Sequence, residues 1–211
     1  MRLPAATFEW LRRWYFEELE DENVEEETDS GPCMNQRAAP TAMTHLPPAL
    51  KDRLSEELYP LMRRWFLEDS YYDAEPPGPG NEGPELREDP VGAMQSYRHR
   101  NSGELQLTSI YGVRRYTNGS VLRMHVDTAN THVISAIINV NQEEVQGGWP
   151  LLILDHDEFE HCVNMRPGDL VLYESAKLLH GRPTKLNGAA YDNIFIHYMP
   201  ADPETWEYGW I

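Results

Sequence analysis

A histidine and an aspartate stand two residues apart in the segment RMHVDT, which covers residues 123–128. In an extended chain, residues i and i+2 project to the same side, so His125 and Asp127 would face the same space. Imidazole nitrogen and carboxylate oxygen are both ligands of divalent transition metals. The pair is therefore a candidate for half of a metal site, and a polar pair beside a turn is the alternative.

A second pair of this kind, His156 and Glu158, lies in the segment DHDEFEH. The segment separates two strand-like runs and offers many ligand atoms, but no apolar surroundings that would exclude water. We interpret it as the solvated tip of a hairpin. The segment VLRMHVD differs, because it mixes apolar and liganding residues next to a turn. The setting therefore favours His125 and Asp127.

A third ligand would have to come from another strand. His180, in the segment LLHGRP, follows the apolar run DLVLYES and is the candidate. Two histidines and one carboxylate on one face of an ion form the facial triad of non-haem Fe(II) oxygenases, which leaves positions open for substrate and O₂. Zinc accepts the same ligands, so the residues alone do not fix the metal.

These candidates need strands to position them, and the chain becomes β-like after residue 100. The run SIYGVRRY ends at Asn118-Gly119, a dipeptide typical of tight hairpin turns. HVISAIINV is nearly all apolar, as a buried strand would be, and RPGDLVLYES and YDNIFIHYMP indicate two more strands. Short strands between regularly spaced turns predict a mainly β domain of jelly-roll type.

The first hundred residues are expected to be partly helical, because apolar residues recur there at helical spacing in two segments. We therefore expect an α+β chain in three parts. Residues 1–45 form an amphipathic helix with an acidic linker. Residues 46–100 form a second helical segment with a Pro/Gly-rich loop, and residues 101–211 form the β domain.

Three tryptophans, Trp10, Trp14 and Trp65, mark the two helical segments. They either dock the helices onto the β domain or form a surface for a protein partner. We expect docking, since amphipathic helices usually bury their apolar stripe. We interpret the Pro/Gly-rich loop at 73–90 as a connector rather than a lid, and the segment WEYGW at 206–210 as a tail packed on the sheet.

The formal net charge of −17 argues against nucleic acid as a partner, because the phosphate backbone would be repelled. Two cysteines, Cys33 and Cys162, form neither a disulfide framework nor a thiolate cluster. The N-terminus lacks the apolar core of a signal peptide, and no segment is long and apolar enough for a membrane span. We therefore expect a cytoplasmic protein without a membrane partner.

From about residue 109 to residue 200 the sequence resembles the prolyl 4-hydroxylase-type catalytic domain of the Fe(II)/2-oxoglutarate dioxygenase superfamily. The similar segments are, in order, YGVRRYTNGSVLRMHVD, ISAIINVN, GGWPLLI, MRPGDLVLYES, LLHGRP and NIFIHY. The resemblance implies a double-stranded β-helix in which His125, Asp127 and His180 bind Fe(II). It also implies that Tyr116 lines a 2-oxoglutarate pocket and that L-ascorbate supports the activity.

One part of that pattern is absent. The family usually carries an arginine or lysine on the last strand, where its charge pairs with the far carboxylate of 2-oxoglutarate. The corresponding positions hold Ala189, Ala190 and Tyr191. Lys185 and Arg182 are the candidates for this role. As alternatives, Lys185 would be a solvated loop residue and Arg182 would support the turn.

The resemblance implies an oxygenase that uses O₂ and 2-oxoglutarate to hydroxylate a peptidyl substrate, such as a prolyl residue, or a small molecule. The absent basic residue favours an alternative, in which a degenerate relative keeps the metal and acts as a binding module. A third hypothesis is a cupin-like metalloenzyme without a cosubstrate. Such proteins normally group several histidines and a glutamate on one strand pair, which the segment HVD does not do.

Overall fold

The computed structural model describes residues 1–18, 24–26, 35–36, 42–68 and 104–201. The helical elements in these ranges are α1 (Ala5–Arg13), a π-helical turn (Trp14–Glu18), α2 (Pro48–Arg63) and a second π-helical turn (Arg64–Glu68). The strands are β1 (Val24–Glu26), β2 (Asn35–Gln36), β3 (Ala42–His45), β4 (Leu105–Thr117), β5 (Val121–His125), β6 (Ile134–Glu143), β7 (Leu151–Leu154), β8 (Glu160–Val163), β9 (Leu170–Tyr173), β10 (His180–Arg182) and β11 (Ala190–Pro200).

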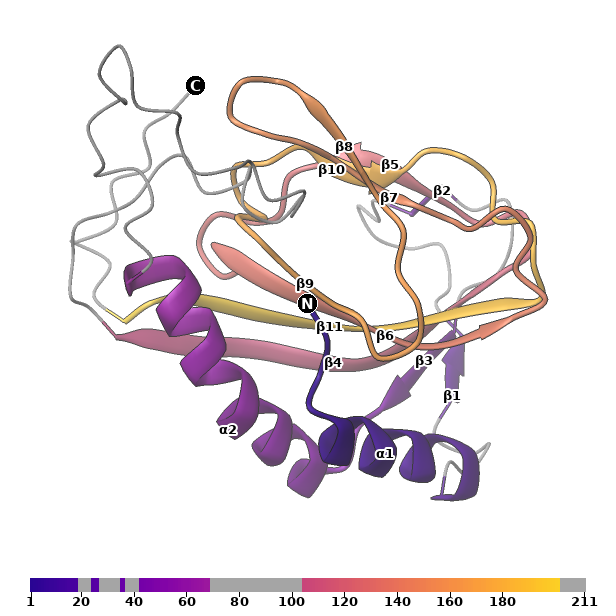
Figure 1. Ribbon diagram of the computed structural model, residues 1–211, viewed down its shortest axis with the longest axis horizontal. Helices are drawn as coiled ribbons and strands as arrows, with labels where there is room; N and C mark the ends of the chain where they lie inside the picture. The colour runs from indigo at the N-terminus through magenta and orange to yellow at the C-terminus, as the bar shows by residue number, and fades with distance from the viewer. Residues whose placement is uncertain (19–23, 27–34, 37–41, 69–103, 202–211) are drawn as a thin grey trace, which may run out of the picture.

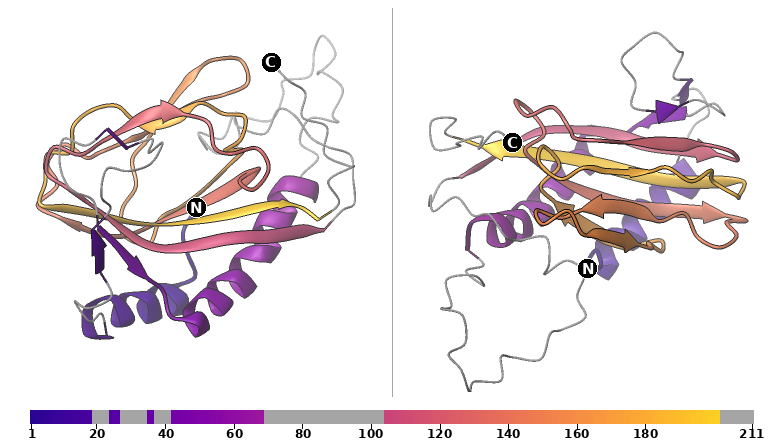
Figure 2. Two further views of the ribbon diagram at one scale, coloured as in Figure 1. Left: turned by 180° about the vertical axis from the view of Figure 1, so that it is seen from behind. Right: turned by 90° about the horizontal axis from the view of Figure 1, so that it is seen from above.

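The strands form two antiparallel sheets. The larger sheet has the strand order β1-β3-β4-β11-β6-β9, and the smaller one has the order β2-β5-β10-β7-β8. The sheets face each other as two layers, and α1 and α2 lie on the outer side of the larger sheet (Figure 1). The view from behind in Figure 2 shows the same order of layers. The expected mainly β architecture with N-terminal helices is therefore confirmed.

The first seven residues of β6, Ile134 to Val140, are buried on both faces, which explains why most of them are apolar. Ile134, Ala136 and Ile138 belong to the core that the larger sheet forms with the helices, which includes Leu54. Ile137, which points to the opposite face, belongs to the core between the two sheets. The helices therefore cover one side of β6 and leave its other side to the space between the sheets.

The N-terminal helices are fixed to the sheet by aromatic packing. Trp14 and Trp65 are 6% and 5% exposed in the core that the helices share with the sheet, and Trp10 packs against it. These tryptophans dock the helices, as predicted.

A polar network adds to this attachment. Tyr15 Oη donates to Asp192 Oδ2 over 2.7 Å, and Arg115 pairs with the same carboxylate at 2.9 Å and 3.0 Å. Asp192 is fully buried in β11, so its charge is balanced from β4 and from the helical segment.

Several expectations fall on residues outside the described ranges. These are the connector at 73–90, the tail at 206–210 and most of the acidic linker. The domain boundaries after residues 45 and 100 stay predictions. Neither α1 nor α2 is long and apolar enough to cross a membrane.

Candidate metal centre

The register of β5 against β10 brings the three predicted ligand residues together. His125 ends β5, His180 begins β10, and the two residues are Cα partners in the antiparallel ladder. Their ring centroids lie 4.4 Å apart. Asp127 follows β5, where its amide donates to Ser175 O over 2.8 Å. One ligand atom from each of the three side chains lies within 4.8 Å of the others, a spacing that could hold a metal ion.

Backbone carbonyls orient both imidazoles. His125 Nδ1 lies 2.7 Å from Arg123 O, and His180 Nδ1 lies 2.8 Å from Leu178 O. A carbonyl oxygen only accepts, so each Nδ1 carries the hydrogen and each Nε2 keeps its lone pair. The two Nε2 atoms face Asp127 Oδ1 at 3.5 Å and 3.8 Å. Two neutral imidazole nitrogens and one carboxylate oxygen fit a divalent transition metal.

The protonation states also suit a metal. Burial lowers the pKa of His180 to about 4, so this side chain is neutral at neutral pH. For Asp127, burial opposes ionisation, but the hydrogen bond with His125 and the nearby histidines outweigh it and lower the pKa. For His125, burial is outweighed by the hydrogen bonds to Asp127 and Arg123 O, which raise the pKa. Protons therefore compete with a metal mainly at His125.

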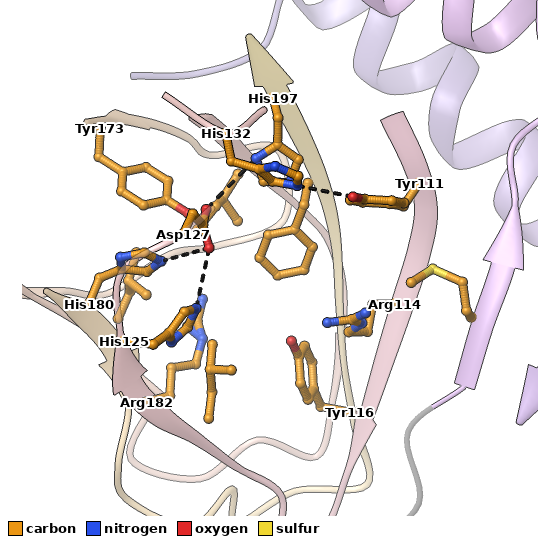
Figure 3. A pocket seen from close by; sticks show the side chains of 15 residues that line it. Tyr111, Arg114, Tyr116, His125, Asp127, His132, Tyr173, His180, Arg182 and His197 are labelled. Carbon is orange, nitrogen blue, oxygen red and sulfur yellow. Dashed lines mark hydrogen bonds and ion pairs between the residues drawn. The ribbon is translucent and has the colours of Figure 1, made fainter. Parts of the chain in front are cut away.

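A cavity of about 240 Å³ lies in front of these three residues, between the two sheets. Figure 3 shows the side chains that line it. Besides the three candidate ligands, the lining residues are Met43, Tyr111, Arg114, Tyr116, Leu122, His132, Ile137, Leu151, Tyr173, Arg182, Phe195 and His197.

Arg182 is a buried cation in this cavity, with an exposed fraction of 1%. Its guanidinium lies over the rings of Trp149 and Tyr191, 4.9 Å from each centroid, and donates to Trp149 O over 3.1 Å. Within the described part of the chain, no carboxylate forms an ion pair with it. A buried charge of this kind is costly unless an anion pairs with it, so the cavity suits an anionic ligand.

Tyr116 lines the cavity with Arg182. Its exposed fraction is 1%, and its ring meets the ring of Trp149 edge to face at 5.0 Å. The Tyr116 hydroxyl is buried and has no hydrogen-bond partner among the described residues. A hydroxyl left in this state is available to a ligand that accepts a hydrogen bond.

Lys185 is exposed and does not line the cavity. At positions 189–191, Tyr191 packs its ring against Trp149 and Arg182. The structure thus brings Tyr116 and Arg182 to the cavity that holds the three candidate ligands, but not Lys185.

The second His-x-acid segment forms the hairpin between β7 and β8, as expected. Phe159 at its tip is 68% exposed. His161 Nε2 lies 2.7 Å from Asp155 Oδ2, and His156 Nε2 lies 2.5 Å from Glu174 Oε2. These side chains pair with one another, and among the described residues only His125, Asp127 and His180 form a cluster that could hold an ion.

Sequence reasoning missed several lining residues. Arg114 could have been found, because it lies two residues before Tyr116 on the same strand and so on the same face. Tyr111 reaches this face through a bulge, since the three-residue step from Ile110 to Val113 in β4 is paired with a two-residue step in β11. A glycine inside a strand, here Gly112, is the available signal for such a bulge.

His132, Tyr173 and His197 were also missed. Tyr173 and His197 belong to β9 and β11, and His132 lies just before β6. All three strands belong to the larger sheet, where β6 pairs with β11 on one side and with β9 on the other. These pairings join segments far apart in the chain, and no local spacing in the sequence indicates them.

No family model matches this sequence, and no curated protein matches it by sequence. Solved structures resemble it at low identity. A prolyl-4-hydroxylase from Pseudomonas putida is 16% identical, with a TM-score of 0.50 over 95% of this chain and 89% of that chain. HygX from Streptomyces hygroscopicus, solved with nickel, 2-oxoglutarate and hygromycin B bound, is 14% identical, with a TM-score of 0.54 over 97% of this chain and 82% of that chain.

AviO1 from Streptomyces viridochromogenes Tue57 is 16% identical, with a TM-score of 0.50 over 95% of this chain and 86% of that chain. A protein of the 2OG-Fe(II) oxygenase family from Burkholderia pseudomallei is matched over only 46% of its length. The matches that span nearly the whole chain confirm the predicted fold, the double-stranded β-helix with N-terminal helices.

Proposed function

We propose that this chain is a non-haem Fe(II)/2-oxoglutarate-dependent oxygenase. It would hydroxylate a peptidyl or small-molecule substrate with one atom of O₂, while the other atom enters succinate as 2-oxoglutarate is decarboxylated to succinate and CO₂. The observation that carries the proposal is the convergence of His125 Nε2, His180 Nε2 and Asp127 Oδ1 on one point of a cavity. The buried Arg182 in the same cavity supports it, because 2-oxoglutarate is a dianion.

His125, Asp127 and His180 would hold Fe(II) on one face. When bound, Fe(II) would supply the redox chemistry, by holding the keto acid end of 2-oxoglutarate and activating O₂. The carbonyls of Arg123 and Leu178 keep both imidazoles in the tautomer that presents Nε2 to the metal.

Arg182 and Tyr116 would bind the far end of 2-oxoglutarate. A planar guanidinium with several donors matches a carboxylate as a two-pronged fork, and stacking between Trp149 and Tyr191 holds this one in place. The Tyr116 hydroxyl would donate a further hydrogen bond to the same carboxylate. Apolar walls, among them Ile137, Leu151 and Phe195, limit the water that competes for these contacts.

This assignment accounts for the missing basic residue on the last strand. Arg182 lies two residues after His180, so both side chains project from β10 into the space between the sheets. The cation would therefore come from the strand that carries a metal ligand, and Tyr191 of β11 would support it.

The substrate would enter from the part of the cavity lined by Tyr111 and His132. Tyr111 is 46% exposed, which places it at the mouth. The proposal covers both substrate classes, since one structural neighbour is named a prolyl-4-hydroxylase and another was solved with hygromycin B bound.

The test is an anaerobic titration of the Fe(II)-loaded protein with 2-oxoglutarate, in which the visible metal-to-ligand charge-transfer band is measured at each addition. We expect a saturable band in the wild type that is absent in His125→Ala. Arg182→Met should need at least about tenfold more 2-oxoglutarate to reach half-saturation of the band, which corresponds to a loss of about 1.4 kcal/mol in binding free energy. Lys185→Ala is the matched control, and its titration curve should equal that of the wild type.

Arg182→Lys separates charge from geometry, because lysine keeps the charge but loses the fork. Thermal unfolding of each variant shows whether it is folded. Bound iron without a band in the wild type would reject the oxygenase and favour the metal-retaining binding module. A band weakened by Lys185→Ala but not by the Arg182 variants would reject Arg182 as the anchor.

A further inference from the structure

A group of three aromatic rings lines the cavity and has no role in the proposed binding of the metal or of 2-oxoglutarate. They belong to Tyr111 on β4, His132 before β6 and His197 on β11. The His132 and His197 ring centroids are 3.9 Å apart, and Tyr111 lies 5.9 Å and 5.7 Å from them. Figure 3 shows this group together, beside Asp127. These rings form a continuous wall on the substrate side.

A chain of hydrogen bonds fixes the tautomer of His197. It begins at His132 O, a carbonyl that only accepts, to which Ser175 Oγ donates over 2.8 Å. With its one hydrogen used, Ser175 must accept from Ser135 Oγ, 2.5 Å away. Ser135 has then used its own hydrogen, so its oxygen accepts a hydrogen bond from His197 Nδ1, which is also 2.5 Å away. The hydrogen of neutral His197 is therefore on Nδ1.

The Asp127 carboxylate agrees with this assignment. Asp127 Oδ2 lies 3.8 Å from His197 Nδ1 and is buried without a hydrogen-bond partner among the described residues. A carboxylate oxygen favours the N–H edge of a neighbouring ring over its lone pair.

His197 Nε2 is consequently a bare acceptor. The residue is 4% exposed, lines the cavity, and forms no hydrogen bond through Nε2 within the described residues. An acceptor in such a place has an uncompensated desolvation cost unless a ligand donates to it. The ligand that fits must present an O–H or N–H group.

Other residues that line the cavity narrow the chemical class of the ligand. Arg114, also on the cavity wall, can only donate, so a ligand that contacts both side chains must both donate and accept hydrogen bonds. A hydroxyl does both, whereas an amide N–H only donates, and the nitrogen of a peptidyl proline carries no hydrogen. The wall of Tyr111, His132 and His197 offers an aromatic surface against which the C–H groups of a saturated ring can pack.

We propose that the substrate is a small polyhydroxylated ring compound, one hydroxyl of which donates to His197 Nε2 while the ring packs on Tyr111 and His132. This inference rests on the proposed function, because it assigns the substrate side of the same cavity. His197 is then a substrate-orienting residue, and a prolyl peptide is the alternative that the experiment must distinguish.

The first experiment determines the tautomer by ¹⁵N NMR of the histidine side chains in the Zn(II)-loaded protein. His197 should show a protonated Nδ1 and a bare Nε2. His161, whose Nε2 lies 2.7 Å from the Asp155 carboxylate, should show a proton on Nε2 and serves as the internal reference. A proton on His197 Nε2 would overturn the proposal.

The second experiment adds probes to the Zn(II)- and 2-oxoglutarate-loaded protein and follows the Nε2 resonance. The probes are myo-inositol, methyl glucoside, streptamine and an N-acetylated prolyl tripeptide amide. At least one of the polyhydroxylated rings should shift the His197 Nε2 resonance in a saturable manner, and the peptide should not. No shift with any ring compound, or a shift with the peptide alone, would overturn the proposal.

Two variants complete the test. His197→Phe removes the acceptor and should weaken binding of the ring compound at least about tenfold, whereas His197→Gln keeps an acceptor and should retain part of the affinity. Both variants should bind 2-oxoglutarate as the wild type does, which shows that they are folded. If the wild type itself does not bind 2-oxoglutarate, the proposed function is rejected. This outcome differs from failure of the substrate inference, in which 2-oxoglutarate binds but the ring compounds do not. Equal ring-compound affinity in His197→Phe and wild type would overturn the role of His197.

Discussion

His125 and His180 are Cα partners in the antiparallel ladder of β5 and β10, although 55 positions separate them in the chain. The only residue between His180 and Arg182 is Gly181, and it has no room for a side chain. A Cβ atom at Gly181 would lie 2.6 Å from Arg123 O and 2.9 Å from Leu122 O. Both are backbone atoms of β5, so they cannot move aside without moving the strand. The close approach of the two strands therefore depends on this glycine.

Gly181→Ala should separate β10 from β5 and so displace His180 relative to His125. We expect the affinity for Zn(II), measured by calorimetry, to fall at least about tenfold, the scale of losses when the supports of metal ligands are disturbed. Gly119→Asn is the control, because Gly119 has open space and a φ of 85° that asparagine tolerates. Unchanged Zn(II) affinity in Gly181→Ala would contradict the dependence of the site on this strand contact.

Tyr116→Phe should affect stability and ligand binding in opposite directions. The hydroxyl is buried without a partner, so its removal should leave the free energy of unfolding of the metal-free protein unchanged or raise it by up to about 1 kcal/mol. The same change should weaken binding of 2-oxoglutarate about tenfold, since the proposed donor is lost. Chemical denaturation and the charge-transfer titration measure the two effects. A destabilised variant with normal 2-oxoglutarate affinity would show that the hydroxyl is structural.

The metal centre could be predicted from the sequence largely because its parts are local. His125 and Asp127 share a face through the two-residue period of a strand, and His180 follows a recognisable apolar strand. The pairing of β5 with β10 was not readable from spacing, but the order of the segments along the chain resembled that of a known family.

The rest of the cavity could not be predicted in the same way. In the sequence, Arg182 and Lys185 are both candidates for the cosubstrate anchor, because both follow His180 closely. Only the structure separates them, since Arg182 stacks against Trp149, which lies just before β7, and against Tyr191 on β11. The wall of Tyr111, His132 and His197 likewise depends on the pairing of β11 with both β4 and β6, which joins segments far apart in the chain and leaves no local pattern.

Asp192→Asn should destabilise the attachment of the N-terminal helices. Asp192 has no exposed surface and accepts hydrogen bonds from Tyr15 and Arg115, so asparagine loses the charge that balances this arginine. Because Arg115 is 38% exposed and its charge is partly solvated, we expect a loss of about 2 kcal/mol rather than the larger cost of a fully buried pair.

Glu143 is the control for this network. It pairs with the same arginine at 3.1 Å but is 45% exposed, so Glu143→Gln should change the free energy of unfolding by less than about 0.5 kcal/mol. Urea denaturation of the two variants gives both values. A loss for Glu143→Gln as large as that for Asp192→Asn would contradict the importance of the buried carboxylate.

The stability of the metal-free protein should fall on acidification because of two buried histidines. Burial lowers the pKa of His197 to about 3 and that of His180 to about 4, against about 6.5 in the unfolded chain. The unfolded state therefore binds more protons between these limits. The contribution of each neutral histidine to the free energy of unfolding is fully present above about pH 7. It is lost as the pH falls, by up to about 1.4 kcal/mol per pH unit.

Comparison with His197→Phe isolates one of these groups. Between pH 6 and pH 4, the EDTA-treated wild type should take up about one more proton on unfolding than the variant does. Its free energy of unfolding should therefore fall more steeply with decreasing pH. The difference between the two proteins should therefore change by about 1.4 kcal/mol per pH unit, in favour of the variant as the pH falls. Parallel pH profiles would mean that His197 is not held neutral by burial, and the low pKa assigned to it would be wrong.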